Sequence, residues 1–376
     1  MRKTPAPTGE YAVGTFTFTV YNDREEVLAP GSMRSIPARV YYPVKKESVE
    51  DMSKARYLSR GVAEGLKNSL NFKIDYDKIE EGGENTSECY ENAPKIEGVK
   101  FPLVIYNHGL GVYREANSFL CLDIASHGYV VICPSHPFDS ACSEADDGTK
   151  VEYDRSAGKK MYQPYLPAMF AIIKVLKAKG TDRELAEKFD LFQKKYCKYL
   201  GSRIEECKKD TLAVLKYAKE NLQDIIDFEK GVGVTGHSLG GVTAYMLCLE
   251  HDEFVCGLNM DGALFGDNMG KILKKPFSQL SCKANVNVET RTYIDHTAPV
   301  YGAVFNDMQH TGFADVKYVI PAKMIVGSLD PDVAHENVCR IHLEMFDSYL
   351  KKIKDHPELE SNEAVTITEY EPDITD

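Results

Sequence analysis

The stretch that decides the fold is GVTGHSLGGVTAY, residues 233–245, in which a serine stands between two glycines where a β-like segment passes into a helix-like one. Strand, sharp turn and helix in this order are typical of a G-x-S-x-G nucleophile elbow. Gly236 and Gly240 let the backbone approach closely, and the start of the helix adds N–H groups and a positive dipole end beside Ser238. A glycine-lined turn without chemistry is the alternative. The choice depends on whether the chain supplies an acid, a base and an oxyanion site.

The composition is that of an ordinary globular protein. The 376 residues include 43% hydrophobic and 27% charged residues, and the formal net charge is −12, which disfavours nucleic-acid binding because phosphate contacts need clustered lysine and arginine. The chain has no run of 18 apolar residues and no apolar stretch after its N-terminal cations, so we expect neither a transmembrane segment nor a secretory signal. Ten scattered cysteines without CxxC pairs indicate reduced thiols, and we expect a cytoplasmic location.

The segments around the opening stretch predict an α/β fold. Residues 101–106 and 128–134 are continuous apolar runs, as in strands covered on both faces, and a helical stretch at 117–126 joins them into a parallel βαβ unit. The predicted architecture is a mostly parallel central sheet with helices on both faces. Further strands are expected at 11–21, 38–43, 255–261, 290–294 and 303–306, and a closing helix at 331–352.

No repeat or linker divides the chain, so we expect a single domain over residues 1–376 with its core at about 11–352. Residues 45–100 and 139–221 are expected to be variable insertions, and 365–376 an acidic tail that is frayed from residue 370 onward.

Residues 167–179, PAMFAIIKVLKAK, are largely apolar but carry three lysines, and the leading proline suits a helix start. A lid or an interfacial helix that touches a membrane surface transiently is one interpretation. We favour a buried packing helix.

An oxyanion site needs two hydrogen-bond donors placed where negative charge develops. The backbone N–H of Leu239, directly after Ser238, is the first candidate. The second is the N–H of Leu110, because the HGLG loop at 108–111 follows an apolar strand and its glycines let the backbone turn inward. A plain loop with His108 as a structural histidine is the alternative.

The acid is expected after the next strand, which places Asp261 one helix and one strand beyond Ser238. A carboxylate at the end of an apolar strand is costly unless it is hydrogen-bonded, so a histidine partner would explain it. Asp330 is a rival in a loop after a later apolar segment. Asp330 and Asp332 could equally cap the last helix, with Pro331 in its first turn.

The base must be one of ten histidines. His310 lies in a loop beyond the late strands and follows Asp261 in the chain, as the order serine, acid, histidine requires. His296, His335 and His342 are rivals, the last two on the predicted final helix. His335, Cys339 and His342 on one helix without a fourth ligand are a weak metal pattern, and we expect no metal.

These motifs together resemble the plasma-type, lipoprotein-associated platelet-activating factor acetylhydrolases, which are calcium-independent phospholipases of α/β-hydrolase fold. The resemblance implies that Ser238 is the nucleophile, Asp261 the acid and His310 the base, with Leu110 and Leu239 as oxyanion donors, and it decides against Asp330. It extends over about 11–352 and rests on YAVGTFTF (11–18), ARVYYPV (38–44), FPLVIYNHGLGVYREANSFLCLDIASHGYVV (101–131), GVTGHSLGGVTA (233–244), FVCGLNMDGALF (254–265) and HTGFAD (310–315).

The resemblance implies a serine hydrolase that cleaves the sn-2 ester of platelet-activating factor, or of related short-chain or oxidised phospholipids, through an acyl-enzyme and without a metal or organic cofactor. The implied partner is a phospholipid or small ester. Leu239 stands where phenylalanine often follows the serine, and residues 45–100 and 165–221 match poorly, which leaves the acyl pocket open. The alternatives are a broader carboxylesterase, lipase or polyester-type hydrolase, and a catalytically inactive hydrolase-like binding protein.

Overall fold

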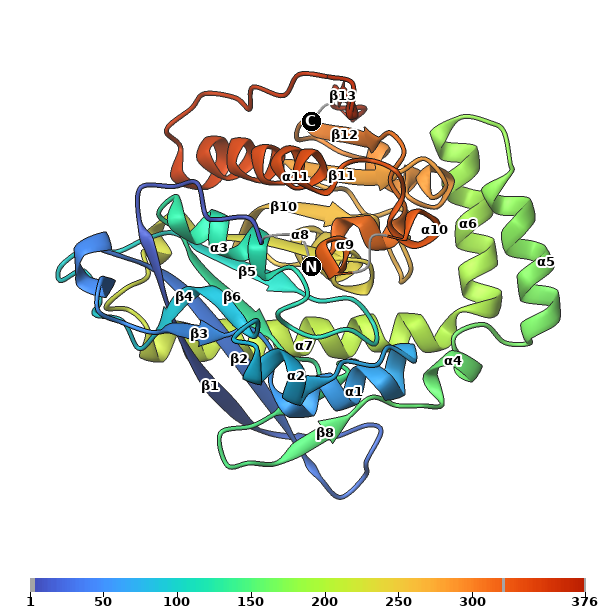
Figure 1. The fold of residues 1–376 in the computed structure, drawn as a ribbon. Coiled ribbons are helices and arrows are strands. Elements are labelled where there is room, and N and C mark those ends of the chain that lie inside the picture. The colour runs from blue at the N-terminus through green and yellow to red at the C-terminus, as the bar shows by residue number, and fades with distance from the viewer. Residues whose placement is uncertain (1–3, 320–321, 375–376) are drawn as a thin grey trace. The chain divides into compact units, whose positions relative to one another are not determined.

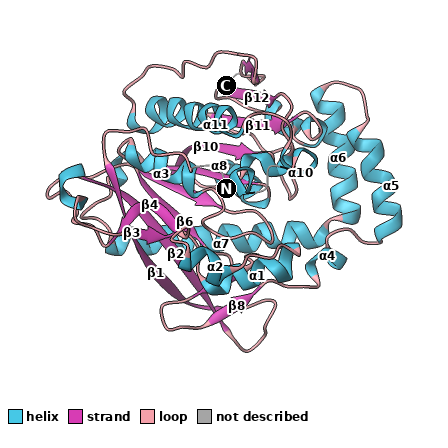
Figure 2. Cartoon of the chain, in the orientation of Figure 1, coloured by secondary structure: helices cyan, strands magenta, loops and turns pink. Residues whose placement is uncertain are grey.

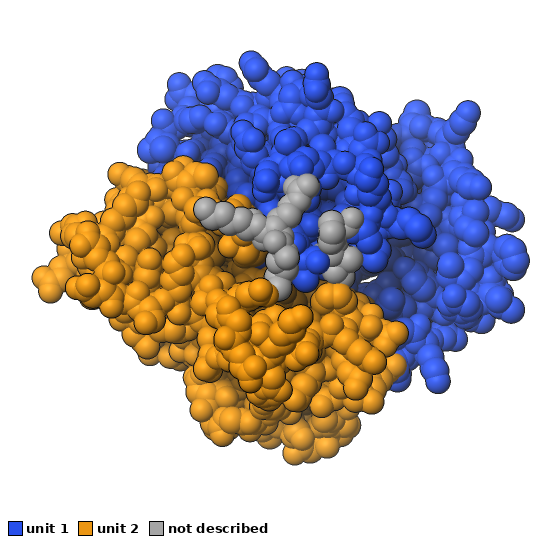
Figure 3. Space-filling model, viewed as in Figure 1, with its two compact units in different colours: residues 1–3, 156–208, 232–376 blue, residues 4–155, 209–231 orange. Residues whose placement is uncertain are grey.

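The computed structural model describes residues 4–319 and 322–374. The chain divides into two compact units, which Figure 3 colours separately. Unit 2 consists of residues 4–155 and 209–231, and the described residues of unit 1 are 156–208, 232–319 and 322–374. Within those described residues no helix is long and apolar enough to cross a bilayer. The expectation of one domain over the whole chain stays a prediction.

The sheet strands of unit 1 are mostly parallel. From the edge inward the order is β13-β12-β11-β10-β9, and only β13 runs antiparallel to its neighbour. The residues of β9, β11 and β12 are almost all buried, as expected for parallel strands covered on both faces. The strands are β9 (Val232–His237), β10 (Phe254–Met260), β11 (Phe277–Cys282), β12 (Val300–Phe305) and β13 (Val365–Tyr370).

Two helices pack closely on these strands at glycine positions. A Cβ at Gly233 would press into Phe346 and Leu350, where α11 and the following π-turn cover β9, and a Cβ at Gly257 would meet Cys248 of α8. Close helix–sheet contact therefore depends on small residues in the strands. The helices of unit 1 are α4 (Ala157–Lys160), α5 (Tyr165–Leu176), α6 (Asp182–Tyr196), α8 (Leu239–Glu250), α9 (Val316–Val319), α10 (Lys323–Val326) and α11 (Pro331–Phe346), with η3 (Val286–Val288), η4 (Thr290–Tyr293), η5 (His310–Phe313) and the π-turn η6 (Asp347–Lys351); α7 (Lys198–Asn221) continues from unit 1 into unit 2.

Unit 2 contains the predicted βαβ unit. β5 (Leu103–Asn107), α3 (Ser118–Ser126) and β6 (Val130–Pro134) follow one another, and the two strands pair in parallel, so this prediction is confirmed. The strand order is β5-β6-β2-β1-β4-β3, with a long antiparallel hairpin of β1 and β2 (Figure 1). The remaining elements are β1 (Ala12–Glu25), β2 (Met33–Val44), η1 (Lys46–Val49), β3 (Lys54–Arg56), α1 (Arg60–Leu70), α2 (Tyr76–Glu81), β4 (Thr86–Glu91), β7 (Cys142–Glu144), β8 (Lys150–Glu152) and η2 (Phe228–Lys230).

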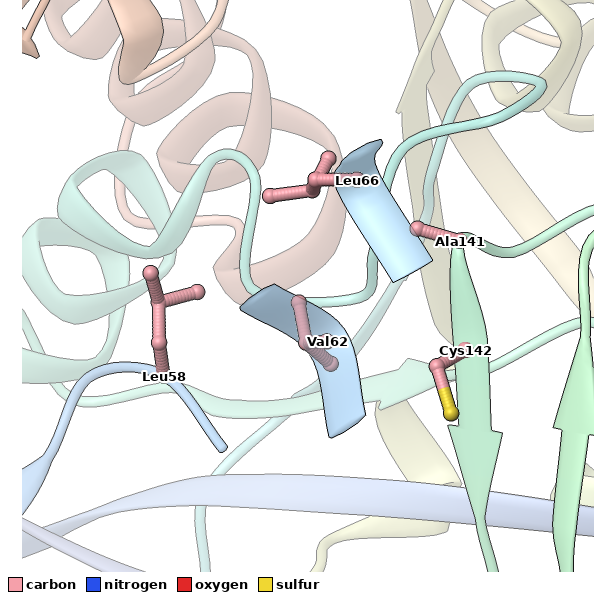
Figure 4. Close-up of a cluster of buried hydrophobic side chains, with 5 residues drawn as sticks. All are labelled: Leu58, Val62, Leu66, Ala141 and Cys142. Atoms are coloured by element: carbon pink, nitrogen blue, oxygen red, sulfur yellow. The ribbon is translucent and has the colours of Figure 1, made fainter. Parts of the chain in front are cut away.

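The segment 45–100, expected to be a variable insertion, folds into short strands and helices (Figure 2). Its helix α1 is amphipathic: Val62 and Leu66, together with Leu58 just before the helix, pack against Ala141 and Cys142 in a small buried cluster (Figure 4). Gly65 allows this approach, because a Cβ there would overlap with the carbonyl oxygen of Ala141. The segment 45–100 is therefore anchored by an apolar cluster that it shares with residues 141 and 142.

Two expectations about elements in unit 1 were wrong, and one strand was missed. Residues 290–293 form the 3₁₀ helix η4 rather than a strand, because the buried Arg291 guanidinium bonds the carbonyls of Asn268 and Ile294 and holds the turn. Residues 365–370, expected to begin an acidic tail, form the edge strand β13, since pairing with β12 satisfies their backbone and the Tyr370 ring stacks on Tyr293 at 4.2 Å. The strand β11 was not predicted at all.

The interpretation of 167–179 as a buried packing helix was also wrong. In α5 only Ala168 and Val175 are buried, whereas Leu166, Phe170 and Ile173 are 67%, 69% and 46% exposed. The helix is held at its C-terminal end instead, where the Asn287 side chain donates to the carbonyls of 175, 176 and 178. Its apolar face is therefore left to solvent.

Candidate active site

Ser238 occupies a strained turn between β9 and α8. Its backbone angles are φ 57° and ψ −120°, in the positive-φ region that side chains other than glycine rarely adopt. Its N–H donates to the carbonyl of Met260 at 2.9 Å, and its carbonyl accepts from Gly241 and Val242 at the start of the helix. Such a turn presents the hydroxyl at the end of a strand and beside a helix N-terminus.

Close backbone packing around this turn depends on two glycines and one asparagine. A Cβ at Gly241 would overlap with Oδ1 of Asn259, and a Cβ at Gly262 would overlap with the carbonyl of Ser238. Asn259 bridges the turn after β10, accepting from the Gly262 N–H at 2.9 Å and donating to its carbonyl at 2.7 Å. Sequence reasoning missed Asn259, because an asparagine inside an apolar strand carried no motif.

Asp261 follows β10 directly and is 1% exposed. The strand register pairs Met260 with His237, so Asp261 and Ser238 leave neighbouring strands side by side. The carboxylate accepts four hydrogen bonds: Oδ1 from the Cys282 N–H at 2.6 Å, and Oδ2 from His310 Nδ1 at 2.6 Å, Asn285 Nδ2 at 2.7 Å and Cys282 Sγ at 3.3 Å. Burial alone would raise the pKa of Asp261, but the hydrogen bond and charge of His310, with the Cys282 and Asn285 donors, hold that pKa below its usual range.

His310 begins the 3₁₀ turn η5, and its side chain is 39% exposed. Because Asp261 accepts at Nδ1, the proton is assigned to that nitrogen and Nε2 carries the lone pair. No hydrogen bond joins His310 to Ser238, both of which are among the described residues. Catalytic hydrogen bonds are often long before substrate binds.

His237, next to Ser238 in the motif, supports the His310 loop. Its Nε2 donates to the carbonyl of His310 at 3.0 Å, and the two ring centroids lie 4.7 Å apart. Burial, followed by the nearby His310, lowers the pKa of His237 to about 3, so this ring is neutral at physiological pH. His237 therefore acts on the position of His310 rather than as a base of its own.

The rival residues have other partners. Asp330 caps α11 by accepting from the Asp332 N–H at 2.9 Å, which is the capping role left open in the sequence analysis. His296 is buried with Nδ1 at 2.8 Å from the Ala298 carbonyl, and His342 is buried with Nε2 at 2.9 Å from Thr235 Oγ1. His335 contacts Cys339 one turn away on the same helix. Among the described residues no group of three metal-ligating side chains could hold an ion.

The model of the family described as platelet-activating factor acetylhydrolase, isoform II, matches residues 1–365. The chain belongs to this family. The resemblance seen in the sequence motifs is thereby confirmed.

Two relatives named platelet-activating factor acetylhydrolase show how distant the similarity is. The Bos taurus protein is 25% identical over 304 residues, which cover 74% of this chain and 64% of that protein. The Cavia porcellus protein is 24% identical over 270 residues, 69% of this chain and 60% of that protein. The match therefore spans less than two thirds of the length of these relatives.

A solved structure with a similar fold is the ferulic acid esterase from Streptomyces cinnamoneus. It has a TM-score of 0.70 and 19% identity, with 96% of this chain and 98% of that chain covered. At this identity the likeness concerns the fold alone. The fold is the α/β-hydrolase fold, as the sequence analysis predicted.

Within this family member, the two proposed oxyanion donors have different surroundings. Leu239 is the first residue of α8, where backbone N–H groups have no partner within the helix. Leu110 belongs to unit 2, in the HGLG loop after β5, and its role stays a prediction. His108 in that loop is buried, with Nδ1 at 2.7 Å from the Gly109 carbonyl and Nε2 accepting from the His136 N–H at 3.0 Å, which fits a structural histidine.

Sequence reasoning also missed the groups around Asp261. Cys282 ends β11, the strand that was not predicted, and Asn285 follows it, so nothing in the sequence tied them to Asp261. Glu289 is fully buried, and neither carboxyl oxygen has a hydrogen-bond partner among the described residues. Burial, and then the negative charge of Asp261, raise the pKa of Glu289 well above its usual range. A second buried carboxyl group therefore lies near Asp261, and burial favours its protonated form.

Proposed function

We propose that the chain is a serine ester hydrolase in which Ser238 is the nucleophile, His310 the base and Asp261 the acid. The observation that carries the proposal is the 2.6 Å bond from His310 Nδ1 to the buried Asp261 carboxylate, in the unit where Ser238 occupies a strained strand-to-helix turn. Family membership supports the same assignment. The order of the three residues in the chain is that of α/β-hydrolases.

The proposed reaction has two halves. His310 Nε2 takes the Ser238 proton as Oγ attacks the ester carbonyl, and Asp261 holds the imidazolium that forms. The imidazolium then gives its proton to the leaving alcohol, which leaves an acyl-serine. A water that passes a proton to His310 attacks the acyl group. The imidazolium then returns that proton to Oγ as the bond to the acyl carbon breaks, which releases the carboxylic acid and restores Ser238 and neutral His310.

The oxyanion of each tetrahedral intermediate would be held by the backbone N–H groups of Leu239 and Leu110. Leu239 is supported by its place at the first turn of α8, where the N–H groups and the helix dipole favour negative charge. Leu110 is supported by the family motif alone.

The proposed substrate is a phospholipid with a short or oxidised sn-2 acyl chain, such as platelet-activating factor. Support comes from the relatives' names and the family match. A lipid substrate would also explain why α5 exposes an apolar face, formed by Leu166, Phe170 and Ile173. We propose that this face touches the lipid surface transiently, with the lysines of the same segment near the headgroups.

A substrate panel tests the proposal. Hydrolysis of acetyl-phospholipid is compared with that of p-nitrophenyl esters of increasing length, and active serine is labelled with a fluorophosphonate probe. Ser238→Ala should lose labelling and at least about a thousandfold in kcat/KM. Ser48→Ala, at an exposed turn of unit 2, should change neither.

The outcomes separate the candidate functions. A loss below tenfold in Ser238→Ala would refute the nucleophile assignment. Labelled enzyme that cleaves long p-nitrophenyl esters faster than acetyl-phospholipid would indicate the broader carboxylesterase. An unlabelled, inactive wild-type protein would indicate a binding protein with this fold.

Vesicle co-sedimentation tests the lipid contact separately. Phe170→Glu and Ile173→Glu should weaken binding to phospholipid vesicles without changing hydrolysis of a soluble p-nitrophenyl acetate. Leu191→Glu, on the exposed side of α6, serves as a control for loss of a single exposed apolar group. Unchanged sedimentation of both α5 variants would rule out this face.

A further inference from the structure

Residues 285–289 form a short segment of unit 1 that contacts both the proposed catalytic acid and α5. The segment follows β11 and includes the 3₁₀ turn η3. Its Asn285 side chain bonds Asp261, and its Asn287 side chain bonds the C-terminal end of α5. Neither asparagine belongs to the sequence motifs that indicate a hydrolase.

Asn285 donates to the carboxylate oxygen that also accepts from His310. Its Nδ2 lies 2.7 Å from Oδ2 of Asp261, and His310 Nδ1 lies 2.6 Å from the same oxygen. The other oxygen, Oδ1, accepts from the backbone N–H of Cys282 at 2.6 Å. The Cys282 thiol also reaches Oδ2, at 3.3 Å, but a thiol is a weak donor. Asn285 is therefore the main donor, apart from His310, that fixes the position of Oδ2.

The same bond affects how strongly Asp261 attracts the proton on His310. A donor that bonds the ionised carboxylate stabilises its charge and so lowers its basicity. Burial opposes the ionised form of Asp261, but His310, the Cys282 N–H and the Asn285 amide together hold the pKa of Asp261 below its usual range. Loss of the Asn285 donor would therefore make Asp261 a stronger base.

Asn287 joins the segment to α5. Its Nδ2 lies 3.3, 3.0 and 2.8 Å from the backbone carbonyl oxygens of residues 175, 176 and 178. The last carbonyls of a helix have no partner within it, so this amide satisfies part of the C-terminal end of α5. Only Val286 separates the two asparagines in the chain. The end of α5 therefore helps to set the position of Asn285.

We propose that Asn285 is a positioning residue for Asp261, and that α5 holds Asn285 in place through Asn287. The proposal rests on the assignment of Asp261 and His310 in the proposed function. Asn285 keeps Oδ2 of Asp261 within reach of His310 Nδ1 and limits the basicity of the carboxylate. Activity should therefore depend on a helix end that contains no catalytic residue.

The titration of the His310 imidazole tests the role of Asn285. NMR of protein with isotope-labelled histidines follows the midpoint, with His310→Gln to assign the signal, and the acid limb of kcat/KM on p-nitrophenyl acetate reports it from activity. Asn285→Leu keeps a similar volume but provides no donor, so the midpoint should rise by at least about 0.5 pH unit. Because a misplaced acid orients His310 less well, kcat should fall at least about fivefold.

The direction of the shift decides the outcome. A midpoint that stays in place or falls would overturn the role of Asn285 even if kcat drops, because a merely structural asparagine would lower activity without raising the midpoint. If Asn285→Leu does not fold, Asn285→Ala removes the same donor and should also raise the midpoint. Asn221→Ala removes an exposed amide that bonds the Tyr217 carbonyl in α7, and it should change neither quantity.

The other titratable or charged side chains near the Asp261–His310 pair are the same in all these variants and so do not account for a difference between them. They are His237 of β9, Cys282 of β11, Glu289 just before η4 and Lys317 of α9.

Asn287→Ala tests the connection to α5. It leaves the Asn285 amide intact but removes the bond to the helix, and the midpoint should rise by a smaller amount. The double variant Asn285→Leu/Asn287→Ala should show the shift of Asn285→Leu alone, because Asn287 acts through Asn285. An unchanged midpoint in Asn287→Ala, or shifts that add in the double variant, would overturn the connection. The soluble ester keeps any lipid contact of α5 out of the comparison.

The NMR measurement separates this proposal from the proposed function. If Ser238→Ala keeps its activity, or Ser238 does not react with a fluorophosphonate, the proposed function fails. The His310 midpoint can still be measured, and a rise in Asn285→Leu would still show that Asn285 controls the Asp261–His310 pair. A reactive Ser238 with no rise in the midpoint would reject the role of Asn285 and leave the proposed function standing.

Discussion

The Nδ1 of His310 lies 2.6 Å from Oδ2 of Asp261, and that carboxylate is buried while the imidazole is 39% exposed. This relationship joins two residues that are 49 positions apart in the chain. A buried acceptor fixes the tautomer of the ring, and the exposed side leaves Nε2 open to a reacting group.

Asp261→Asn should lower kcat about 10³- to 10⁴-fold with little change in fold. The amide keeps the size of the carboxylate, but it can donate to Nδ1 and so favours the wrong tautomer of His310, and it no longer stabilises an imidazolium. Steady-state kinetics on a soluble ester would measure the loss. Asp330→Asn is the matched control, since asparagine caps a helix as well as aspartate, and it should retain activity. Equal losses in the two variants would contradict the assignment of Asp261.

Glu289→Gln should stabilise the protein at pH 7 and leave it unchanged near pH 4. The pKa of Glu289 is raised in the folded state, so at neutral pH the unfolded chain has released a proton that the native protein retains. Glu289 therefore contributes fully to stability below the pKa that it has in the unfolded chain. The contribution falls as pH rises, by about 1.4 kcal/mol per pH unit, until the pKa of Glu289 in the folded protein is reached. Urea unfolding at pH 4, 5.5 and 7 would detect the difference. Glu363→Gln, in an exposed loop, should show no such pH dependence. A Glu289→Gln variant that is less stable at pH 7 would show that Glu289 is ionised there.

Acid should destabilise the fold through buried neutral histidines. Burial, as the largest cause, lowers the pKa of His108 and His237 to about 3 and that of His342 to about 4. Below a pH of about 6.5, the pKa of histidine in the unfolded chain, these histidines are protonated when unfolded but stay neutral in the folded protein. Stability therefore falls as pH drops from about 6.5 towards 3 to 4. Each ring should contribute about 1.4 kcal/mol per pH unit at most. The proton uptake on unfolding at pH 5, compared between wild type and His342→Gln, should differ by about one; no difference would contradict a neutral His342.

Gly241→Ala should destabilise the protein by about 1–3 kcal/mol or prevent folding. The new methyl group would overlap with Oδ1 of Asn259, which bridges the turn that contains Asp261 and cannot move without breaking its bond to Gly262. Thermal unfolding would report the loss. Gly201→Ala in α7 is the control, because nothing lies within 4 Å of its Cβ position, and it should raise stability by up to about 1 kcal/mol. Similar stability of the two variants would mean that the turn tolerates a side chain at 241.

Part of the candidate site can be predicted from the sequence, because its residues lie at the ends of apolar segments or at glycine-flanked junctions between elements. Ser238 lies between glycines at a strand-to-helix change, Asp261 ends an apolar strand, and the βαβ unit around 101–134 has the right period. The chain order then suggests which acid and base serve the serine. The choice among several aspartates and histidines needed the family resemblance, since spacing alone also allowed Asp330 and three other histidines.

The tertiary structure alone decided the surroundings of these residues. Arg291 turned a strand-like segment into a 3₁₀ helix, and β12 gave Val365–Tyr370 a pairing partner that a local pattern cannot reveal. Cys282 at the end of an unpredicted strand, and Asn285 and Glu289 beyond it, meet at Asp261. Arg39 likewise forms an ion pair with Glu115, a residue far from it in the chain. Sequence by itself determined the fold class and the strand-end residues, because periodicity and glycine placement are local. Burial, hydrogen-bond partners and charge sharing depend on which distant segments meet, and only the folded chain sets them.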